Sequence, residues 1–384
     1  MAVIVIKLGT SSICDEKSFY PKLASLSALV ETVVKLRING HQVLVVTSGA
    51  VGVGLRRMNF TERPKALSQI QATAAVGQGR LMALYDTLFG QFDVPIAQIL
   101  LTRENLADRC QYKNACLTLK ELLQWNVVPI INENDSVSNA EIRFGDNDTL
   151  SAIAAGMVHA DYLFLLTDVD CLYTDNPRVN PDAKPVRVVQ NIASLRQQVN
   201  VASSGSSIGT GGMVTKLVAA ELATAAGCAM MILRGANPHL IIDAIEEIRQ
   251  SNNSSFQPSI GTLFLAKPNP MNDRKWWIRY GLAPAGALYV DDGAARAIAV
   301  NKSSLFAVGI TRVEGDFDAL QSVRIFASTN NATAVEIAKG VVNYSSTDIR
   351  RICGKNSAQI ADILGYIDTE YVVYRGNIVT SPSE

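Results

Sequence analysis

Histidine is scarce in this chain, and its two signs of charge cancel. The 384 residues include three histidines, and 35 Lys and Arg residues balance 35 Asp and Glu residues. No histidine has a cysteine or serine beside it in a triad-like setting, and no His and Cys spacing is typical of a metal site. A chain without net charge has no general field that attracts nucleic acid or a membrane surface. These absences argue against a histidine-based nucleophilic enzyme and against a zinc protein.

Cysteine pairs and long apolar runs are also lacking. The six cysteines are spread along the chain without a Cys-x-x-Cys pair, which indicates thiols in a reducing compartment. Residues 1–8 lack the basic region and the length of a signal peptide, and no apolar run approaches the ~20 residues of a membrane span. We therefore expect a cytoplasmic protein with no membrane association. Its length favours more than one domain.

Short apolar segments alternate with helical ones over the first 250 residues. Strands are predicted at 2–8, 42–46, 127–131, 162–166 and 229–233, and helices at 21–38, 150–158, 217–226 and 240–249. A strand, a helix and a strand in this order form a right-handed crossover between parallel strands. The predicted fold class is α/β, with an open, mainly parallel sheet flanked by helices.

Polar residues follow these strands at the points where the strands end. They are Lys7, Ser48, Asn134, Asp135, Thr167 and Asp168. In an open α/β sheet these ends share one edge, and ligands bind there. A turn or a helix cap explains any one of them. Their joint occurrence at strand ends favours a binding site.

A run of small residues at 205–212 precedes Lys216 and a helical segment. Glycines allow consecutive backbone N–H groups to turn toward one anion, and the helix start and the lysine add positive charge. The run is not a Walker motif, because Thr215 precedes the lysine and Leu217 follows it. The alternative is a flexible Ser/Gly linker. Together with Lys7 and the acids at 146–148, the run indicates phosphoryl transfer.

These motifs resemble the amino acid kinase family, and within it the glutamate 5-kinases. The resemblance is carried, in order, by residues 6–11, 47–50, 131–135, 145–148, 166–168 with 172–174, and 209–216. It covers residues 1 to about 250. It implies ATP as phosphoryl donor, Mg²⁺ as helper and the γ-carboxylate of L-glutamate as acceptor. The implied product is L-glutamyl 5-phosphate, formed in the first step of proline biosynthesis.

The resemblance also implies roles for single residues. The expected catalytic residues are Lys7, Asp148 and Lys216, with the two lysines flanking the transferred phosphoryl group and the acid orienting both. The expected glutamate-binding residues are Ser48, Asn134, Asp135 and Asn147. The expected nucleotide-binding residues are Gly9, Gly49, Thr167, Asp168, Thr210, Gly211, Gly212, Met213, Thr215 and Lys216. No protein ligand to a metal is expected, and no general base is needed for an acceptor whose carboxyl pKa is ~4.3.

The last third of the chain has a different rhythm of short strands and turns. Strands are predicted at 286–290, 307–313, 322–326 and 371–374, with short helices from 292 and at 347–353. This part resembles a PUA domain, a small β-barrel, but departs from it at Leu320-Gln321, where that family often has Gly with an acid. The expected domains are an amino acid kinase domain at 1–258, a linker at 259–275 and a PUA-like domain at 276–384.

PUA domains elsewhere bind RNA, but residues 285–384 contain 9 Lys and Arg against 11 Asp and Glu. That balance lacks a basic footprint, so we do not expect RNA binding here. The expected partners are L-glutamate and ATP, with feedback inhibition by proline, hand-off of the product to the next reductase and a homo-oligomeric state.

Two alternatives stay open. One is a kinase for another acceptor, such as aspartate, N-acetylglutamate or a nucleoside monophosphate. The other is a non-catalytic sensor of nucleotide or amino acid with the same fold. The joint presence of Lys7, Asp148 and Lys216 favours an enzyme, and the motif at 132–135 with the PUA-like tail favours glutamate as acceptor.

Overall fold

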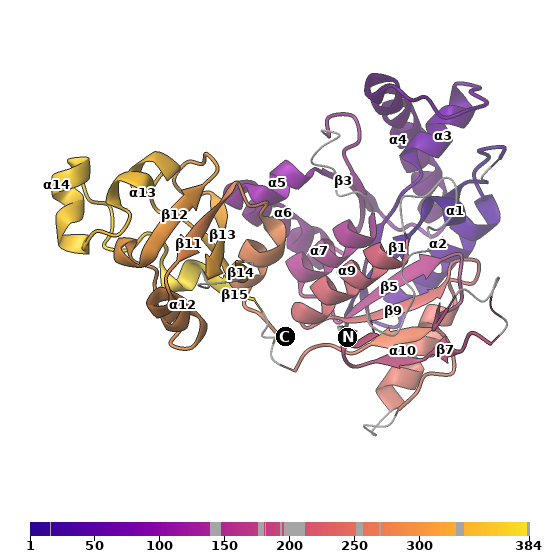
Figure 1. Ribbon diagram of the computed structural model, residues 1–384. Helices are drawn as coiled ribbons and strands as arrows, with labels where there is room; N and C mark the ends of the chain where they lie inside the picture. The colour runs from indigo at the N-terminus through magenta and orange to yellow at the C-terminus, as the bar shows by residue number, and fades with distance from the viewer. Residues whose placement is uncertain are drawn as a thin grey trace. The chain divides into compact units, whose positions relative to one another are not determined.

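The chain divides into two compact units, Met1–Pro270 and Met271–Glu384 (Figure 1). The computed structural model describes residues 1–15, 17–138, 147–175, 180, 182–192, 194–195, 212–250, 256–268, 270–327 and 334–381. Among these residues, no helix has both the length and the apolar character that crossing a membrane requires.

The first unit is built on an eight-stranded sheet with the order β3-β4-β2-β1-β5-β9-β10-β8. The strands are β1 (Val3–Leu8), β2 (Gln42–Val46), β3 (Ile96–Leu101), β4 (Val128–Glu133), β5 (Tyr162–Thr167), β8 (Val188–Val189), β9 (Ala229–Arg234) and β10 (Thr262–Phe264). Neighbours from β3 to β9 are parallel, and β10 is antiparallel to β9. The predicted α/β class with an open, mainly parallel sheet is confirmed. The strands β6 (Leu172–Tyr173) and β7 (Pro185–Val186) form a separate pair.

Helices cover both faces of this sheet. They are α1 (Thr10–Ile13), α2 (Leu23–Ile38), α3 (Ala50–Arg57), α4 (Leu67–Gly90), α5 (Arg103–Ala107), α6 (Arg109–Gln124), α7 (Asn147–Val158), α9 (Met213–Ala225) and α10 (Leu240–Gln250). Ile4, Ile6 and Leu8 of β1 share one core with α2, α4 and α10. Because side chains alternate along a strand, Lys7 lies on the opposite face, where α7 packs on β1 and on α9 (Figure 1).

The second unit has a mixed five-stranded sheet with the order β12-β11-β13-β14-β15. The strands are β11 (Gly286–Val290), β12 (Ile310–Glu314), β13 (Ser322–Ala327), β14 (Val335–Val341) and β15 (Ile378–Thr380). The helices are α11 (Asp273–Trp276), α12 (Asp292–Ala299), α13 (Ser346–Ile352) and α14 (Ile360–Leu364), with short turns of π- or 3₁₀-helix at Trp277–Gly281, Ala307–Gly309, Ser357–Gln359 and Arg375–Asn377. Leu320 has φ 68° and is exposed, so the chain holds a left-handed turn without the glycine that favours one.

Some predicted elements differ from the structure. The segment predicted as a linker contains β10, which pairs with β9 and β8 in the sheet of the first unit. This strand has only three residues, Thr262–Phe264, too few for a pattern to distinguish a strand from a connection. The segment 371–374 forms only an isolated bridge between Leu305 and Val373. Neither α4 nor β3 was predicted.

Helices α3 and α4 cross with their backbones in direct contact. A Cβ atom on Gly77 of α4 would lie 1.8 Å from the carbonyl oxygen of Ala50, and one on Gly54 of α3 would lie 1.9 Å from the carbonyl oxygen of Thr73. Only glycine permits this approach. Because α3 begins directly after the end of β2, the crossing also fixes the turn that carries Ser48.

We predict that Gly77→Ala destabilises the first unit by about 1–3 kcal/mol, because the added methyl group must push α3 away from α4. Gly79→Ala is a matched control on the same helix. Gly79 is exposed with no atom within 4 Å of a Cβ, so that variant should gain up to about 1 kcal/mol of helix propensity. Urea unfolding of both variants tests this, and equal effects at the two positions would contradict the crossing.

Candidate active site

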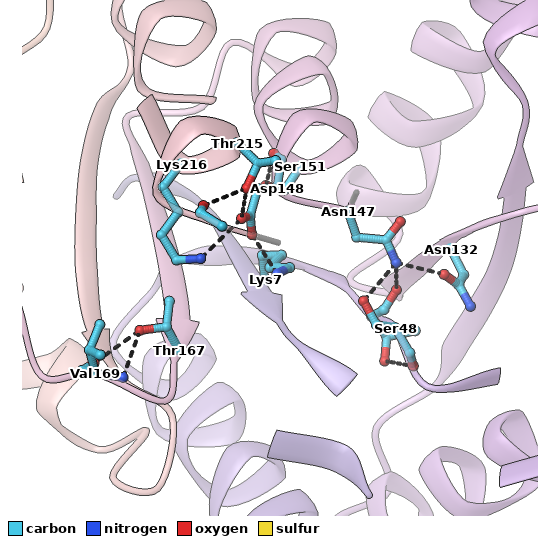
Figure 2. A network of polar contacts seen from close by, with 12 residues as sticks. Lys7, Ser48, Asn132, Asn147, Asp148, Ser151, Thr167, Val169, Thr215 and Lys216 are labelled. Atoms are coloured by element: carbon cyan, nitrogen blue, oxygen red, sulfur yellow. Dashed lines mark hydrogen bonds and ion pairs between the residues drawn. The ribbon is translucent and has the colours of Figure 1, made fainter. Parts of the chain in front are cut away.

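Three charged side chains meet in the interior of the first unit (Figure 2). Asp148, in the first turn of α7, is fully buried. It forms ion pairs with Lys7 from β1 and with Lys216 from the first turn of α9. The Nζ atom of Lys216 lies 3.4 Å from Asp148 Oδ2. The Thr215 hydroxyl donates to the same Oδ2 at 3.1 Å. Lys7 and Lys216 lie 141 and 68 positions from Asp148 in the sequence, and the fold brings all three to one point.

The charges of this cluster do not balance. Burial alone would raise the pKa of Asp148, but the charges of Lys7 and Lys216 outweigh that effect and lower it to about 2. The carboxylate is therefore ionised at any physiological pH. Two ammonium groups face one carboxylate, and both lysines are more than nine-tenths buried. A buried excess of one positive charge favours an anion as the missing partner.

The start of α9 adds to this positive site. Gly212 is its N-cap residue in an extended conformation, and a Cβ there would meet no atom within 4 Å. The Thr215 hydroxyl oxygen also lies 2.8 Å from the Gly212 carbonyl oxygen, so its single proton is shared between that oxygen and Asp148 Oδ2. The first backbone N–H groups of a helix have no partner within it, and the helix dipole is positive there. Met213 lies in this first turn, whereas the predicted residues Thr210 and Gly211 lie outside the described residues.

Two predicted glycines lie at the starts of helices on the same edge of the sheet. Gly9 follows β1 as the N-cap of α1, and a Cβ on it would lie 3.6 Å from the ammonium nitrogen of Lys7. Gly49 follows β2 as the N-cap of α3, with φ 91°. A Cβ on Gly49 would lie 2.9 Å from the side chain of Ile13. Both positions therefore keep backbone close to the polar edge of the sheet.

Asn147, the neighbour of Asp148, joins a second polar cluster. Its side-chain nitrogen lies 2.6 Å from the carbonyl oxygen of Thr47, 2.8 Å from Ser48 Oγ and 3.0 Å from Asn132 Oδ1. Successive residues of a helix point about 100° apart. Asn147 is therefore directed to the ends of β2 and β4, while Asp148 is directed to β1 and α9 (Figure 2).

Helix α4 supports this second cluster with residues that the sequence did not single out. Gln78 accepts a hydrogen bond from Asn132 at 2.9 Å, and the Tyr85 hydroxyl lies 2.9 Å from Thr47 Oγ1. All four of these side chains are buried. Gln78 and Tyr85 are seven residues apart and so share one helix face. The seven-residue spacing was a sequence signal that could have identified Gln78 and Tyr85 as a pair. It is informative only if α4 is already known to be a helix.

The other predicted residues lie at the ends of β4 and β5. Asn134 and Asp135 are half-buried after β4, and Asn134 Oδ1 accepts from the Ser136 hydroxyl at 2.6 Å. Thr167 ends β5, where its hydroxyl bonds the backbone of Val169 and closes a turn (Figure 2). Asp168 is exposed in that turn. In the described part of the chain, no three His, Cys, Asp or Glu side chains gather as a metal site would require.

The depressed pKa of Asp148 predicts how stability depends on pH. Its carboxyl group takes up a proton near its ordinary pKa of 3.8 when the chain is unfolded, and only near pH 2 when it is folded. The stabilisation is therefore complete above about pH 4 and is lost as the pH falls toward 2, by about 2 kcal/mol.

Urea unfolding of wild type and Asp148→Asn between pH 6 and pH 2 measures this contribution. At pH 6 the variant should be about 3–5 kcal/mol less stable, because it leaves two buried ammonium groups uncompensated. The difference should shrink by about 2 kcal/mol toward pH 2. A difference that is constant across the range would contradict the ion cluster.

Comparisons with known proteins agree with this arrangement. Residues 2–234 match the model of the amino acid kinase family, and residues 286–364 match that of the PUA domain. A protein of Schizosaccharomyces pombe named "Probable glutamate 5-kinase" is 53% identical over 379 residues, covering 98% of this chain and 92% of that protein. Glutamate 5-kinases of Acaryochloris marina and Nostoc punctiforme are 49% and 48% identical, each covering 98% of both chains. The chain therefore belongs to the amino acid kinase family, in its glutamate 5-kinase branch, with a PUA domain in its second unit.

Proposed function

We propose that the chain transfers the γ-phosphoryl group of ATP to the γ-carboxylate of L-glutamate and so forms L-glutamyl 5-phosphate, the first step of proline biosynthesis. The observation that carries this proposal is the buried carboxylate of Asp148 between Lys7 and Lys216 at the edge where the parallel strands end. Phosphoryl transfer depends mainly on positioning and on neutralising charge. The names of the relatives, which match over nearly the whole chain, support glutamate as the acceptor.

The two lysines act on the transferred group. Negative charge spreads over the phosphoryl oxygens in the transition state, and preorganised cations in a site shielded from water stabilise it strongly. Asp148 holds both ammonium groups in place. With a pKa of about 2 it is too weak a base to accept a proton at neutral pH, so its role is to orient the lysines. The acceptor carboxylate is already ionised there and needs no base.

Asn147 and Ser48 form the acceptor side of the site. The Ser48 hydroxyl oxygen accepts from Asn147, which leaves its own O–H free to donate to a carboxylate of the substrate. Neither side chain adds charge. Asp135, with Asn134 beside it, supplies the negative group that an amino acid with a free ammonium requires.

The nucleotide binds on the other side of Asp148. The N–H groups at the start of α9, from Gly212 to Thr215, face the phosphates with the Lys216 ammonium group, and Thr167 and Asp168 line the nucleoside side. Mg²⁺ is usually held by one or two carboxylates together with substrate phosphates. Since two lysines already hold Asp148, the site fits a Mg²⁺ ion that arrives on ATP and would be held by the phosphates of the nucleotide. The ion would neutralise phosphate charge.

The proposal extends to the regulation of the reaction and the use of its product. An acyl phosphate is readily hydrolysed, so we propose its hand-off to the next reductase of the pathway, in the cytoplasm. We further propose that proline inhibits the enzyme at the glutamate-binding side and that the chain forms a homo-oligomer. Size-exclusion chromatography with light scattering tests the last point, and a monomer would overturn it.

ATP turnover against a panel of acceptors tests the function. L-glutamate should yield a product that hydroxylamine traps as a hydroxamate, whereas aspartate, N-acetylglutamate and a nucleoside monophosphate should yield little. The same assay with added proline should show a lower rate, and an unchanged rate at millimolar proline would refute the inhibition. ATP binding without turnover of any acceptor would support the sensor alternative.

We predict that Lys7→Ala and Lys216→Ala lower kcat far more than they change the KM for glutamate, since each charge meets charge that develops in the transition state. The loss should be about 3 kcal/mol, or roughly a hundredfold. Lys35→Ala, which removes an exposed lysine of α2, is the control. Near-wild-type kcat in both site variants would refute the assignment.

We predict that Asp135→Asn, which keeps the size of the side chain and removes its charge, raises the KM for glutamate about ten- to a hundredfold through the loss of an ammonium–carboxylate bond worth ~1.5–3 kcal/mol. The KM for ATP should stay nearly unchanged. If the role of Asp135 were only to cap local backbone, asparagine would serve equally well. The variant would then bind glutamate normally and show at most a small shift in Tm.

A further inference from the structure

The second unit contains a cavity that takes no part in the proposed reaction. Its volume is about 560 Å³, which is within the roughly 300–1,000 Å³ typical of small-molecule sites. Its wall is formed by α11, the turn after α12, the 3₁₀ turn Arg375–Asn377 and β15, in the part of the chain drawn from orange to yellow (Figure 1). All of its lining residues belong to this one unit.

The wall of the cavity is positively charged. Lys275, Lys302 and Arg375 line it, and no Asp or Glu does. Residues 285–384 contain more acidic than basic residues, so this concentration of cations is local. In the described part of this unit, Arg312 pairs with Glu314 and Arg350 with Asp316. Within that part, the three cavity cations have no carboxylate partner, and an anion would supply one.

Two of these cations are held at the wall by the backbone around them. Lys302 has φ 53°, a conformation that costs a non-glycine residue energy. Its ammonium group donates to the carbonyl oxygen of Ala299 at 2.8 Å and to Thr380 Oγ1 at 3.3 Å, so within the described chain one of its three donors is unused. The backbone N–H of Arg375 donates to Ser304 Oγ at 2.9 Å, and among the described residues its guanidinium has no hydrogen-bonding partner.

The remaining wall is apolar and aromatic. Ile298, Ile378 and Val379 are buried around the cavity, and Tyr374 lines it with about a third of its surface exposed. The Tyr374 ring lies 5.3 Å from that of Tyr371, centroid to centroid. A ligand that satisfies both parts has a compact, strongly anionic end and a flat or apolar end. A phosphate group, with its several oxygens, can bind a guanidinium and two ammonium groups at once, whereas a single carboxylate has only two oxygens.

We propose that this cavity is a binding site for a small organic phosphate that carries a ring, of the nucleoside monophosphate type. The phosphate lies among Lys275, Lys302 and Arg375, and the ring lies against Tyr374 and the aliphatic wall. This site is separate from Lys7, Asp148 and Lys216 and does not depend on the function proposed for them.

Titration calorimetry of the full chain tests the proposal. The kinase site is first saturated with a non-hydrolysable ATP analogue, Mg²⁺ and glutamate, so that only a further site responds. The probes are adenosine 5′-monophosphate, ribose 5-phosphate and adenosine. We expect one further site for adenosine 5′-monophosphate, weaker binding of ribose 5-phosphate, and no binding of adenosine at the same concentrations. Absence of any further site at millimolar probe would overturn the proposal.

Variants locate the site. Arg375→Gln alone, and together with Lys302→Gln, should weaken the binding of adenosine 5′-monophosphate at least about tenfold, since a charge-assisted hydrogen bond contributes ~1.5–3 kcal/mol. Arg312→Gln and Arg350→Gln are matched controls, because they remove cations of the same unit that lie outside the cavity, and they should change the affinity less than about twofold. Equal affinity in wild type and Arg375→Gln would overturn the assignment. Glutamate phosphorylation should be unchanged in all four variants.

Single-stranded RNA oligonucleotides, added as further probes, distinguish a free small phosphate ligand from the phosphates of a nucleic acid. A 5′-phosphorylated oligonucleotide that binds better than its 5′-hydroxyl counterpart would support a pocket for a terminal phosphate. An oligonucleotide that binds more tightly than adenosine 5′-monophosphate, regardless of its 5′ end and with a steep salt dependence, would show a nucleic-acid surface and overturn the small-ligand proposal.

Discussion

A buried aspartate held between two lysines is the constraint on which the first unit depends. Asp148 lies on α7, Lys7 on β1 and Lys216 on α9, so one cluster joins the central strand β1 to α7, which packs on it, and to α9, which packs on α7 and β9. Removing three charges from water is costly, and an ion left without its partner costs more. The cluster therefore requires that β1, α7 and α9 take one arrangement. The positive charge that it leaves in excess is what a phosphoryl group needs.

Asn147 and Asp148 are adjacent in α7 but point to two chemically different parts of the site. On one side lie charged groups suited to a phosphoryl group. On the other side Asn147, Ser48 and Asn132 form a neutral network that can hold carboxylates without repelling them. Donor and acceptor of a transfer reaction need such different surroundings only a few ångströms apart. In the proposed reaction the start of α7 would provide both, because successive residues of a helix point in different directions.

The neutral side is positioned by packing at a distance from it. The glycine crossing of α3 and α4 sets where the turn after β2 lies, and α4 also carries Gln78, which orients Asn132. A helix with glycines and small polar residues on its buried face has a weak apolar pattern, and that explains why α4 was not predicted. The strands β1, β2 and β5 were predicted closely because strands covered on both faces are continuous apolar runs.

By itself the sequence determined which chemistry is present and in what order along the chain. It specified the parallel α/β class through local apolar patterns. It specified the polar residues at strand ends, together with Lys7, Asp148 and Lys216, through motifs. Only the tertiary structure decided that Asp148 contacts both lysines, that its pKa falls to about 2, that β10 belongs to the sheet and that Lys275, Lys302 and Arg375 share one cavity. These properties arise from burial and from contacts between residues tens to more than a hundred positions apart, and such contacts leave no period in a local stretch of sequence.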